Sequence, residues 1–152
     1  MHLHTDQGVA VSSQKEGLLP ISQTAMIVRS DIAFHDYEGV ALDLDERERL
    51  VADLGPDKHT MLLRNHGTLT CGETAAMTFT RMFFLERACK MQIMALSAGR
   101  DGVLECGDDL QSKVAGQGGM MGHRSGMSKL SEKLVWPAMQ RRLDREAPGY
   151  DI

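Results

Sequence analysis

The chain of 152 residues is long enough to bury a core, and we expect a single domain over residues 1–152. Its composition, 42% hydrophobic and 25% charged residues, is typical of a soluble globular protein. The formal net charge of -4 provides no basic surface for nucleic acid or for an anionic membrane. We therefore predict neither as a partner.

The cysteine content indicates a reducing environment. The chain has three cysteines, Cys71, Cys89 and Cys106. The odd number and the lack of a C-x-x-C pair disfavour both a disulfide framework and a cysteine-based zinc site. The sequence has no signal-peptide pattern, and no apolar run reaches the roughly 18 residues that a membrane span needs. We predict a cytoplasmic protein.

The strands predicted along the chain are short. Alternation and apolar content place them at residues 2–4, 32–34, 40–42, 59–63 and 68–70, and the last of these continues the fourth after a break. Residues 15–20 predict a turn, because Gly17 and Pro20 punctuate them. The apolar run at 21–28 is too short for periodicity to decide between helix and strand.

Helices are predicted at residues 5–13, 43–54, 73–97, 128–134 and 139–145. Thr70 and Glu73 match a capping box that would begin the longest of them, whose wide apolar arc predicts enclosure by other elements or by another subunit. Trp136-Pro137 predicts a break or kink before the last helix. The glycine-rich segment 99–126 predicts a mobile loop with one helical turn near 110–114.

The most specific chemical pattern is the pair of histidines His2 and His4. On a strand both imidazoles would point to the same face, and a third, His66, follows a predicted strand in Asn65-His66-Gly67. Three imidazoles can bind a metal ion and leave one position open for water or substrate. The alternative is two exposed terminal histidines and a histidine that is hydrogen-bonded in a turn. His35 is interpreted as a solvated turn residue rather than a ligand or acid–base group.

Six motifs, taken together and in order, resemble the class II aldolase/adducin family, and most closely its adducin-like bacterial branch. The resemblance runs from His2 to about Tyr150. The motifs are His2-Leu3-His4-Thr5, Lys15-Glu16-Gly17-Leu18-Leu19-Pro20, Phe34-His35-Asp36-Tyr37-Glu38-Gly39, Leu63-Arg64-Asn65-His66-Gly67 with Leu69-Thr70-x-Gly72, Leu85-Glu86-Arg87-Ala88-Cys89, and Leu143-Asp144-Arg145.

The resemblance implies an α/β fold, a three-layer α/β/α domain with a central sheet, in a protein that forms a homo-oligomer, commonly a tetramer. It implies that His2, His4 and His66 bind zinc or another divalent metal. The implied activity is that of a lyase that cleaves a carbon–carbon bond in a sugar phosphate or a related hydroxy-carbonyl compound, so a small-molecule substrate is expected.

The sequence also departs from the family pattern. The family's acid–base Glu and phosphate-binding loop lie ahead of the H-x-H strand, so we expect an N-terminally truncated domain with an exposed sheet edge. Glu16 and Tyr37 are the candidates left for the catalytic group. The alternative function is a non-catalytic, adducin-like oligomeric scaffold whose long helix serves assembly. A cupin-like metal protein also uses H-x-H, but the Glu expected shortly after that motif is missing.

Overall fold

The structure is a computed structural model of the chain, and it describes residues 1–40, 45–122 and 124–151. Its strands form one sheet in the order β1-β4-β3-β2. β2 and β3 run parallel, whereas β4 is antiparallel to both of its neighbours, β1 and β3. The strands are β1 His2–Leu3, β2 Ile32–His35, β3 Thr60–Leu63 and β4 Gly67–Thr70.

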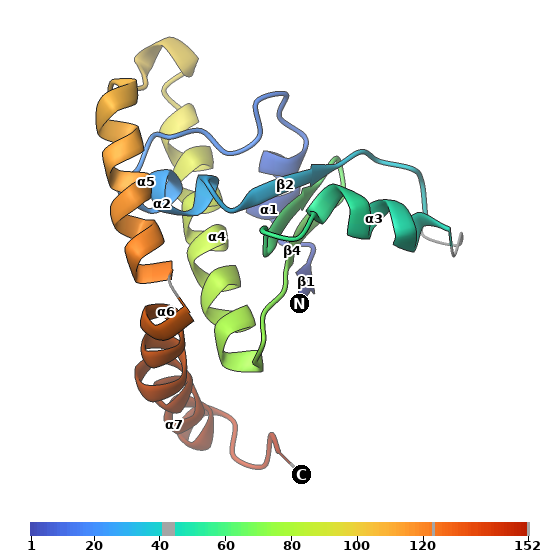
Figure 1. Cartoon of the computed structure of the whole chain (residues 1–152), viewed down its shortest axis with the longest axis vertical. Helices are drawn as coiled ribbons and strands as arrows, with labels where there is room; N and C mark the ends of the chain where they lie inside the picture. The colour runs from blue at the N-terminus through green and yellow to red at the C-terminus, as the bar shows by residue number, and fades with distance from the viewer. Residues whose placement is uncertain (41–44, 123, 152) are drawn as a thin grey trace.

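Helices cover both faces of this sheet. They are α1 Asp6–Ser12, α2 Gln23–Arg29, α3 Glu46–Leu54, α4 Ala75–Leu96, α5 Asp108–Gly122, α6 Arg124–Leu130 and α7 Trp136–Glu146, with a 3-10 turn at Arg100–Gly102 and a π-helical turn at Ser131–Val135. Figure 1 shows α2, α4 and α5 gathered beside the sheet, while α6 and α7 extend away from it toward the C-terminus.

Two apolar clusters show that the fold has three layers. On one face Leu62 of β3 packs in a cluster that includes Val11 of α1 and Leu85 of α4. On the other face Met61 and Leu63 pack with residues of α3. All four residues of β3 are buried, as expected for a strand covered on both sides. The predicted three-layer α/β/α fold is therefore confirmed.

Several predictions about where helices begin and end are confirmed, and the hydrogen bonds at the helix ends explain them. The side chain of Thr5 accepts a hydrogen bond from the backbone N–H of Gly8 and begins α1, as predicted. The ambiguous segment 21–28 forms a helix, α2, capped by Ser22. α3 ends before Gly55, whose φ of 67° lies in the left-handed region that favours glycine. The predicted strand at 40–42 and the predicted cap Asp43 fall largely in residues 41–44, outside the described residues.

Two predictions about the segments around β4 are wrong. The strand at 68–70 does not continue β3 but returns antiparallel to it. The capping box at Thr70 and Glu73 does not form, because Thr74 caps α4 by accepting a hydrogen bond from the N–H of Met77. Thr70 is part of β4, and its hydroxyl donates to the carbonyl of Thr78 at 3.0 Å. A strand pairing thus removes Thr70 from the helix start.

The predicted irregular loop at 99–126 is also wrong, because α5 and the start of α6 occupy most of it. α5 packs closely against α2. A Cβ at Gly118 would lie 2.5 Å from Ile27 Cγ2. The glycine there permits close helix packing, which a glycine-rich sequence does not distinguish from a flexible loop. At the predicted break near Trp136-Pro137 the chain stays helical, because a π-helical turn precedes α7 and accommodates the proline that follows it.

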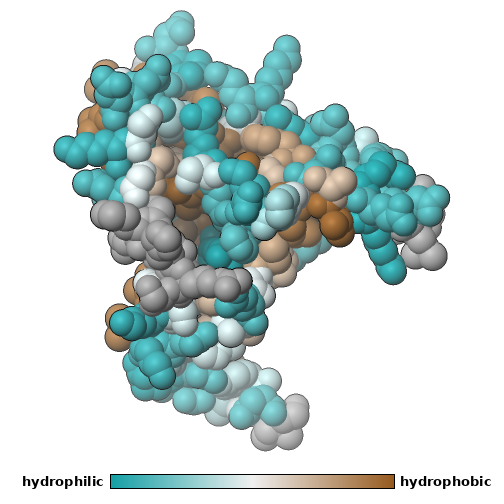
Figure 2. Space-filling model, in the orientation of Figure 1, coloured by the Kyte–Doolittle hydropathy of each residue, from teal (hydrophilic) through white to brown (hydrophobic). Residues whose placement is uncertain are grey.

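The surface is largely hydrophilic on the side shown in Figure 2, and apolar residues gather toward the middle of that view. No helix within the described ranges is both long and apolar enough to cross a membrane.

The three cysteines should differ in reactivity. Cys89 is fully buried on α4, and burial, with a smaller contribution from the charge of Glu86, raises the pKa of its thiol to about 12. Because the thiolate is the nucleophile, we expect Cys89 to stay unmodified in the folded protein at pH 8, while exposed Cys106 is alkylated. Iodoacetamide labelling followed by mass spectrometry would test this. Modification of Cys89 at the rate of Cys106 would contradict the packing described.

Candidate metal centre

The first residues of the chain are held in the sheet. His2 pairs with Leu69 and Leu3 with Thr68 in the antiparallel β1–β4 ladder. The N-terminal ammonium of Met1 donates to the carbonyl of Thr70, and the N–H of Thr70 donates to the carbonyl of Met1, each at 2.8 Å. This pairing fixes the backbone that carries His2 and His4.

A tight hairpin places the third histidine. Leu63 and Gly67 are paired across β3 and β4, and Arg64, Asn65 and His66 form the loop between them. Asn65 has a φ of 56°, a left-handed conformation that asparagine tolerates better than most residues. The loop is closed by a hydrogen bond of 3.0 Å from the N–H of His66 to the carbonyl of Leu63. Its end adjoins β1, so His66 comes to lie beside His2 and His4.

The three imidazoles converge through their Nε2 atoms. His4 Nε2 lies 2.7 Å from His2 Nε2 and 2.9 Å from His66 Nε2. The ring centroids are 4.4 to 4.8 Å apart. Among the residues that the structure describes, these three form the one group whose ligand atoms all lie within 4.8 Å of one another. Nitrogen atoms so close together need a proton or a cation between them.

The hydrogen bond of the other ring nitrogen sets the tautomer of His2. Its Nδ1 lies 2.8 Å from the carbonyl oxygen of Thr68, which can only accept, so Nδ1 carries the hydrogen and donates. In the neutral ring, Nε2 therefore presents a lone pair to His4 and His66. A backbone carbonyl on the second nitrogen is a common way to orient a metal-binding histidine.

The donor set fits a divalent metal ion. Zinc with imidazole ligands at about 2.0–2.1 Å requires nitrogen atoms about 3.3 Å apart. The separations between the Nε2 atoms would therefore have to increase by only about 0.5 Å. Two of the rings are exposed and the third is partly exposed, which leaves room for this adjustment. Three nitrogen ligands leave one tetrahedral position for water or substrate, the arrangement typical of catalytic rather than structural zinc.

Gly67 is required beneath this cluster. A Cβ at residue 67 would lie 2.4 Å from the carbonyl oxygen of Leu3 and 3.1 Å from His4 Cδ2. The backbone of β1 could not then keep its present distance from β4. The Asn-His-Gly motif thus combines a turn residue, a candidate ligand and a residue that allows β1 to approach.

The two catalytic candidates from the sequence are placed differently. Tyr37 is 54% exposed, and its ring centroid lies 6.4 Å from that of His66. The carboxylate of Glu16 instead lies 3.5 Å from the guanidinium of Arg100, beyond the end of α4. Of the two, Tyr37 is the one that the structure brings to the histidines.

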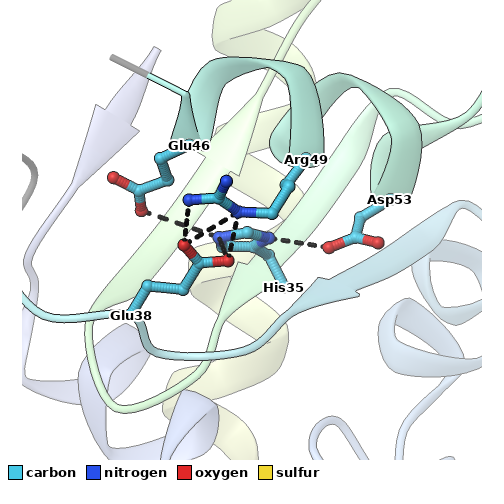
Figure 3. Close-up of polar contacts among 5 residues, drawn as sticks. All are labelled: His35, Glu38, Glu46, Arg49 and Asp53. Atoms are coloured by element: carbon cyan, nitrogen blue, oxygen red, sulfur yellow. Dashed lines mark hydrogen bonds and ion pairs between the residues drawn. The ribbon is translucent and has the colours of Figure 1, made fainter. Parts of the chain in front are cut away.

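Sequence reasoning misses the environment of His35, and its interpretation as a solvated turn residue is wrong. His35 is only 4% exposed, and its Nδ1 lies 2.7 Å from Asp53 of α3. Its Nε2 faces Glu46 at 3.6 Å and Glu38 at 3.9 Å, and Figure 3 shows the ring between the Glu46 and Asp53 carboxylates, with Arg49 paired to Glu38. These contacts fasten α3 and the segment after β2 to the sheet, near the end of β3 that leads to His66.

An apolar cavity lies elsewhere. It has a volume of about 520 Å³ and is lined by residues of α2 and α4 and by the chain that enters β3, among them Ile27, Phe84 and His59. The histidines lie beyond the opposite end of β3. Side-chain chemistry, rather than cavity size, therefore identifies the candidate site.

The fold and the site together define a class: a three-layer α/β/α domain with a candidate metal site of three histidines at one end of its sheet. Residues 1–93 match the family model described as Class II Aldolase and Adducin N-terminal domain. The chain belongs to this family.

The relatives support this assignment over the whole chain. A protein of Caulobacter vibrioides, provisionally named an aldolase class 2 protein, is 57% identical over 150 residues, which cover 99% of this chain and 56% of that protein. Human gamma-adducin is 43% identical over 103 residues, 68% of this chain and 14% of that protein.

The crystal structure of an aldolase II superfamily protein from Pseudomonas syringae aligns with a TM-score of 0.88 and 45% identity, covering 99% of this chain and 57% of that one. The chain thus spans just over half the length of the bacterial relatives that it matches.

Replacing Gly67 with Ala should damage the site. The added Cβ would push β1 from β4 and separate His2 and His4 from His66, so we expect at least about a tenfold loss of Zn²⁺ affinity in a chelator competition titration. Gly116→Ala in α5 is the matched control, because no atom of another element lies within 4 Å of the position that its added methyl group would take. The control should keep its Zn²⁺ affinity and gain roughly 0.5–1 kcal/mol of stability. Equal Zn²⁺ affinity in both variants would contradict the close approach.

Bound metal should be lost on acidification. Burial, and then the charges of His2 and His4, lower the pKa of His66 from its ordinary value of 6.5, so this ring is neutral and able to bind at pH 7. Protons compete with metal for the ligand nitrogen atoms. We therefore expect full occupancy above pH 7 and progressive release as the pH falls below about 6. Equilibrium dialysis with elemental analysis measures this, and full occupancy retained at pH 4 would argue against histidine ligands.

Proposed function

We propose that this chain carries the metal site of a zinc-dependent lyase of the class II aldolase type, acting on a sugar phosphate or a related hydroxy-carbonyl compound. The observation that carries the proposal is the convergence of His2, His4 and His66 Nε2 atoms at 2.7 and 2.9 Å. Family membership supports a divalent metal as cofactor. The all-nitrogen donor set favours zinc over magnesium or calcium, which prefer oxygen ligands.

Each residue of the site would have a distinct chemical role. A divalent ion, when bound, supplies a Lewis acid that polarises a carbonyl oxygen. The Thr68 carbonyl holds the His2 ring in the orientation and tautomer needed for binding. Tyr37 lies at the exposed rim, where its hydroxyl can donate a hydrogen bond or a proton to a substrate oxygen.

The proposed cellular setting is the cytoplasm, and the proposed assembly is a homo-oligomer, a tetramer by analogy with the family. All three cysteines are free, which suits a reducing compartment. The long helix α4 exposes Phe83 by 43% and Met94 by 66%, and such apolar side chains suit contact with another subunit.

A second candidate function is an adducin-like scaffold that keeps the fold without the chemistry. The observation in its favour is the 43% identity with gamma-adducin, which covers 68% of this chain. The scaffold requires a stable oligomer but does not need a bound metal, whereas the lyase does. Metal binding therefore separates the two functions.

The test of the metal site is stoichiometry. We expect about one equivalent of Zn²⁺ per chain in the wild type and a loss of binding by a factor of about 100 or more in His66→Ala, because one of three ligands is gone. His59→Ala is the control, since His59 contacts Asp31 at the other end of β3 and should leave the affinity unchanged. A wild-type protein without affinity for Zn²⁺ would refute the lyase and favour the scaffold.

The chemistry can be tested on the same metal-loaded protein. Dihydroxyacetone phosphate has a hydroxyl beside its carbonyl, so an aldolase-type site should exchange a C–H proton of this compound with D₂O. The proton must pass to a base, and Tyr37 is the candidate for this role that lies beside the histidines. We therefore expect NMR-detected exchange that requires Zn²⁺ and is lost in both His66→Ala and Tyr37→Phe. Metal binding without exchange would limit the proposal to a binding site for this class of compound.

A further inference from the structure

Glu86 of α4 is linked to the candidate metal site through other residues. Among the residues that the structure describes, its side chain hydrogen-bonds to two threonines and to no histidine. Its Oε1 accepts a hydrogen bond of 2.6 Å from the hydroxyl of Thr68, and its Oε2 accepts one from the hydroxyl of Thr5. Glu86 belongs to a motif that suggested family membership, but its sequence context assigned it no role.

Both hydroxyl donors are directly linked to candidate ligands. The carbonyl of Thr68 accepts the Nδ1–H of His2 at 2.8 Å, and Thr68 pairs with Leu3 in the β1–β4 ladder. Thr5 follows His4 and caps α1 through the N–H of Gly8 at 3.0 Å. A single carboxylate of α4 therefore holds both Thr5, which follows the H-x-H pair, and Thr68, which pairs with Leu3 from the neighbouring strand.

The space around this carboxylate is tight. A Cβ at Gly8 would lie 2.8 Å from the Thr5 hydroxyl oxygen, 2.9 Å from Thr68 Cγ2 and 3.0 Å from Glu86 Oε1. Thr68 is fully buried. On the side that faces Gly8 there is therefore no room for an added side-chain atom between Thr5, Thr68 and Glu86.

The charge of Glu86 also matters. The two hydroxyl groups that contact it are neutral, so its negative charge is not cancelled by these partners. That charge acts on its surroundings, since it helps to raise the pKa of the Cys89 thiol. Three neutral imidazoles with a divalent ion carry excess positive charge, which a carboxylate linked to the ligands through hydrogen bonds stabilises.

We propose that Glu86 is a positioning residue of the metal centre: through the hydroxyls of Thr5 and Thr68 it holds His2 and His4 in the geometry that binds a divalent cation, and its charge favours that cation. This inference rests on the metal site of the proposed function. It adds a carboxylate that is separated from His2 by 84 positions in the sequence.

Glu86→Gln removes the charge and keeps one acceptor oxygen. We expect its dissociation constant for Zn²⁺ to rise by a factor of about 10–100, the usual cost of losing a group that orients a metal ligand. The absorption spectrum of the Co²⁺-loaded protein should also change in band position or intensity, because the ligand geometry changes. The control is Glu48→Gln, the same chemical change at an exposed position of α3, and it should match the wild type in both measurements.

Thr68→Val and Thr68→Ser test the link itself. Valine has nearly the shape of threonine but no hydroxyl, so it should weaken Zn²⁺ binding, whereas serine restores the donor to Glu86 and should recover most of the affinity. Circular dichroism and thermal unfolding of the metal-free variants show that each is folded. A purely structural role would lower the unfolding temperature without altering the Co²⁺ spectrum of the folded, loaded protein.

The outcomes are distinct. A folded Glu86→Gln variant with wild-type Zn²⁺ affinity and Co²⁺ spectrum overturns the positioning role and leaves the proposed function intact. If Glu86→Gln does not fold, Thr68→Val decides in the same way. Absence of metal binding in the wild type overturns the metal site, and the role of Glu86 falls with it.

Discussion

The pairing of β1 with β4 is the interaction on which the candidate site depends. It brings His2 and His4 beside a hairpin loop more than 60 residues away in the sequence. The strand has only two residues, so few ladder hydrogen bonds hold it, and the bonds between Met1 and Thr70 extend the pairing by one position. The absence of a side chain at Gly67 allows the two backbones to approach this closely.

Thr68 connects this pairing to the rest of the fold. Its backbone carbonyl orients His2, while its side-chain hydroxyl donates to Glu86 of α4. The apolar face of α4 packs against β3 in one core cluster, so the geometry of the histidines is tied to the main core. A site whose ligands are mostly exposed can thus be held by a buried strand and a long helix.

Sequence patterns predicted the regular elements well where local rules decide the structure. Thr5 as a cap, the end of α3 before Gly55, the buried β3 and the long α4 follow from capping, periodicity and chain breakers. The predictions failed where packing decides. Within residues 99–126, Gly118 permits close helix contact at Ile27, and Thr70 is used in a strand rather than in a helix cap.

The sequence by itself was enough to single out His2, His4 and His66 as candidate ligands and to indicate the family. An H-x-H pair, an Asn-His-Gly turn and four further motifs are local patterns, and they occur in the family's order along the chain. Only the tertiary structure decided where the carboxylates lie. Glu86 reaches the H-x-H segment, whereas Asp53 and Glu46 contact the buried His35 and Glu16 pairs with Arg100. These contacts join residues far apart in sequence, and no spacing or periodicity encodes a distance across the fold.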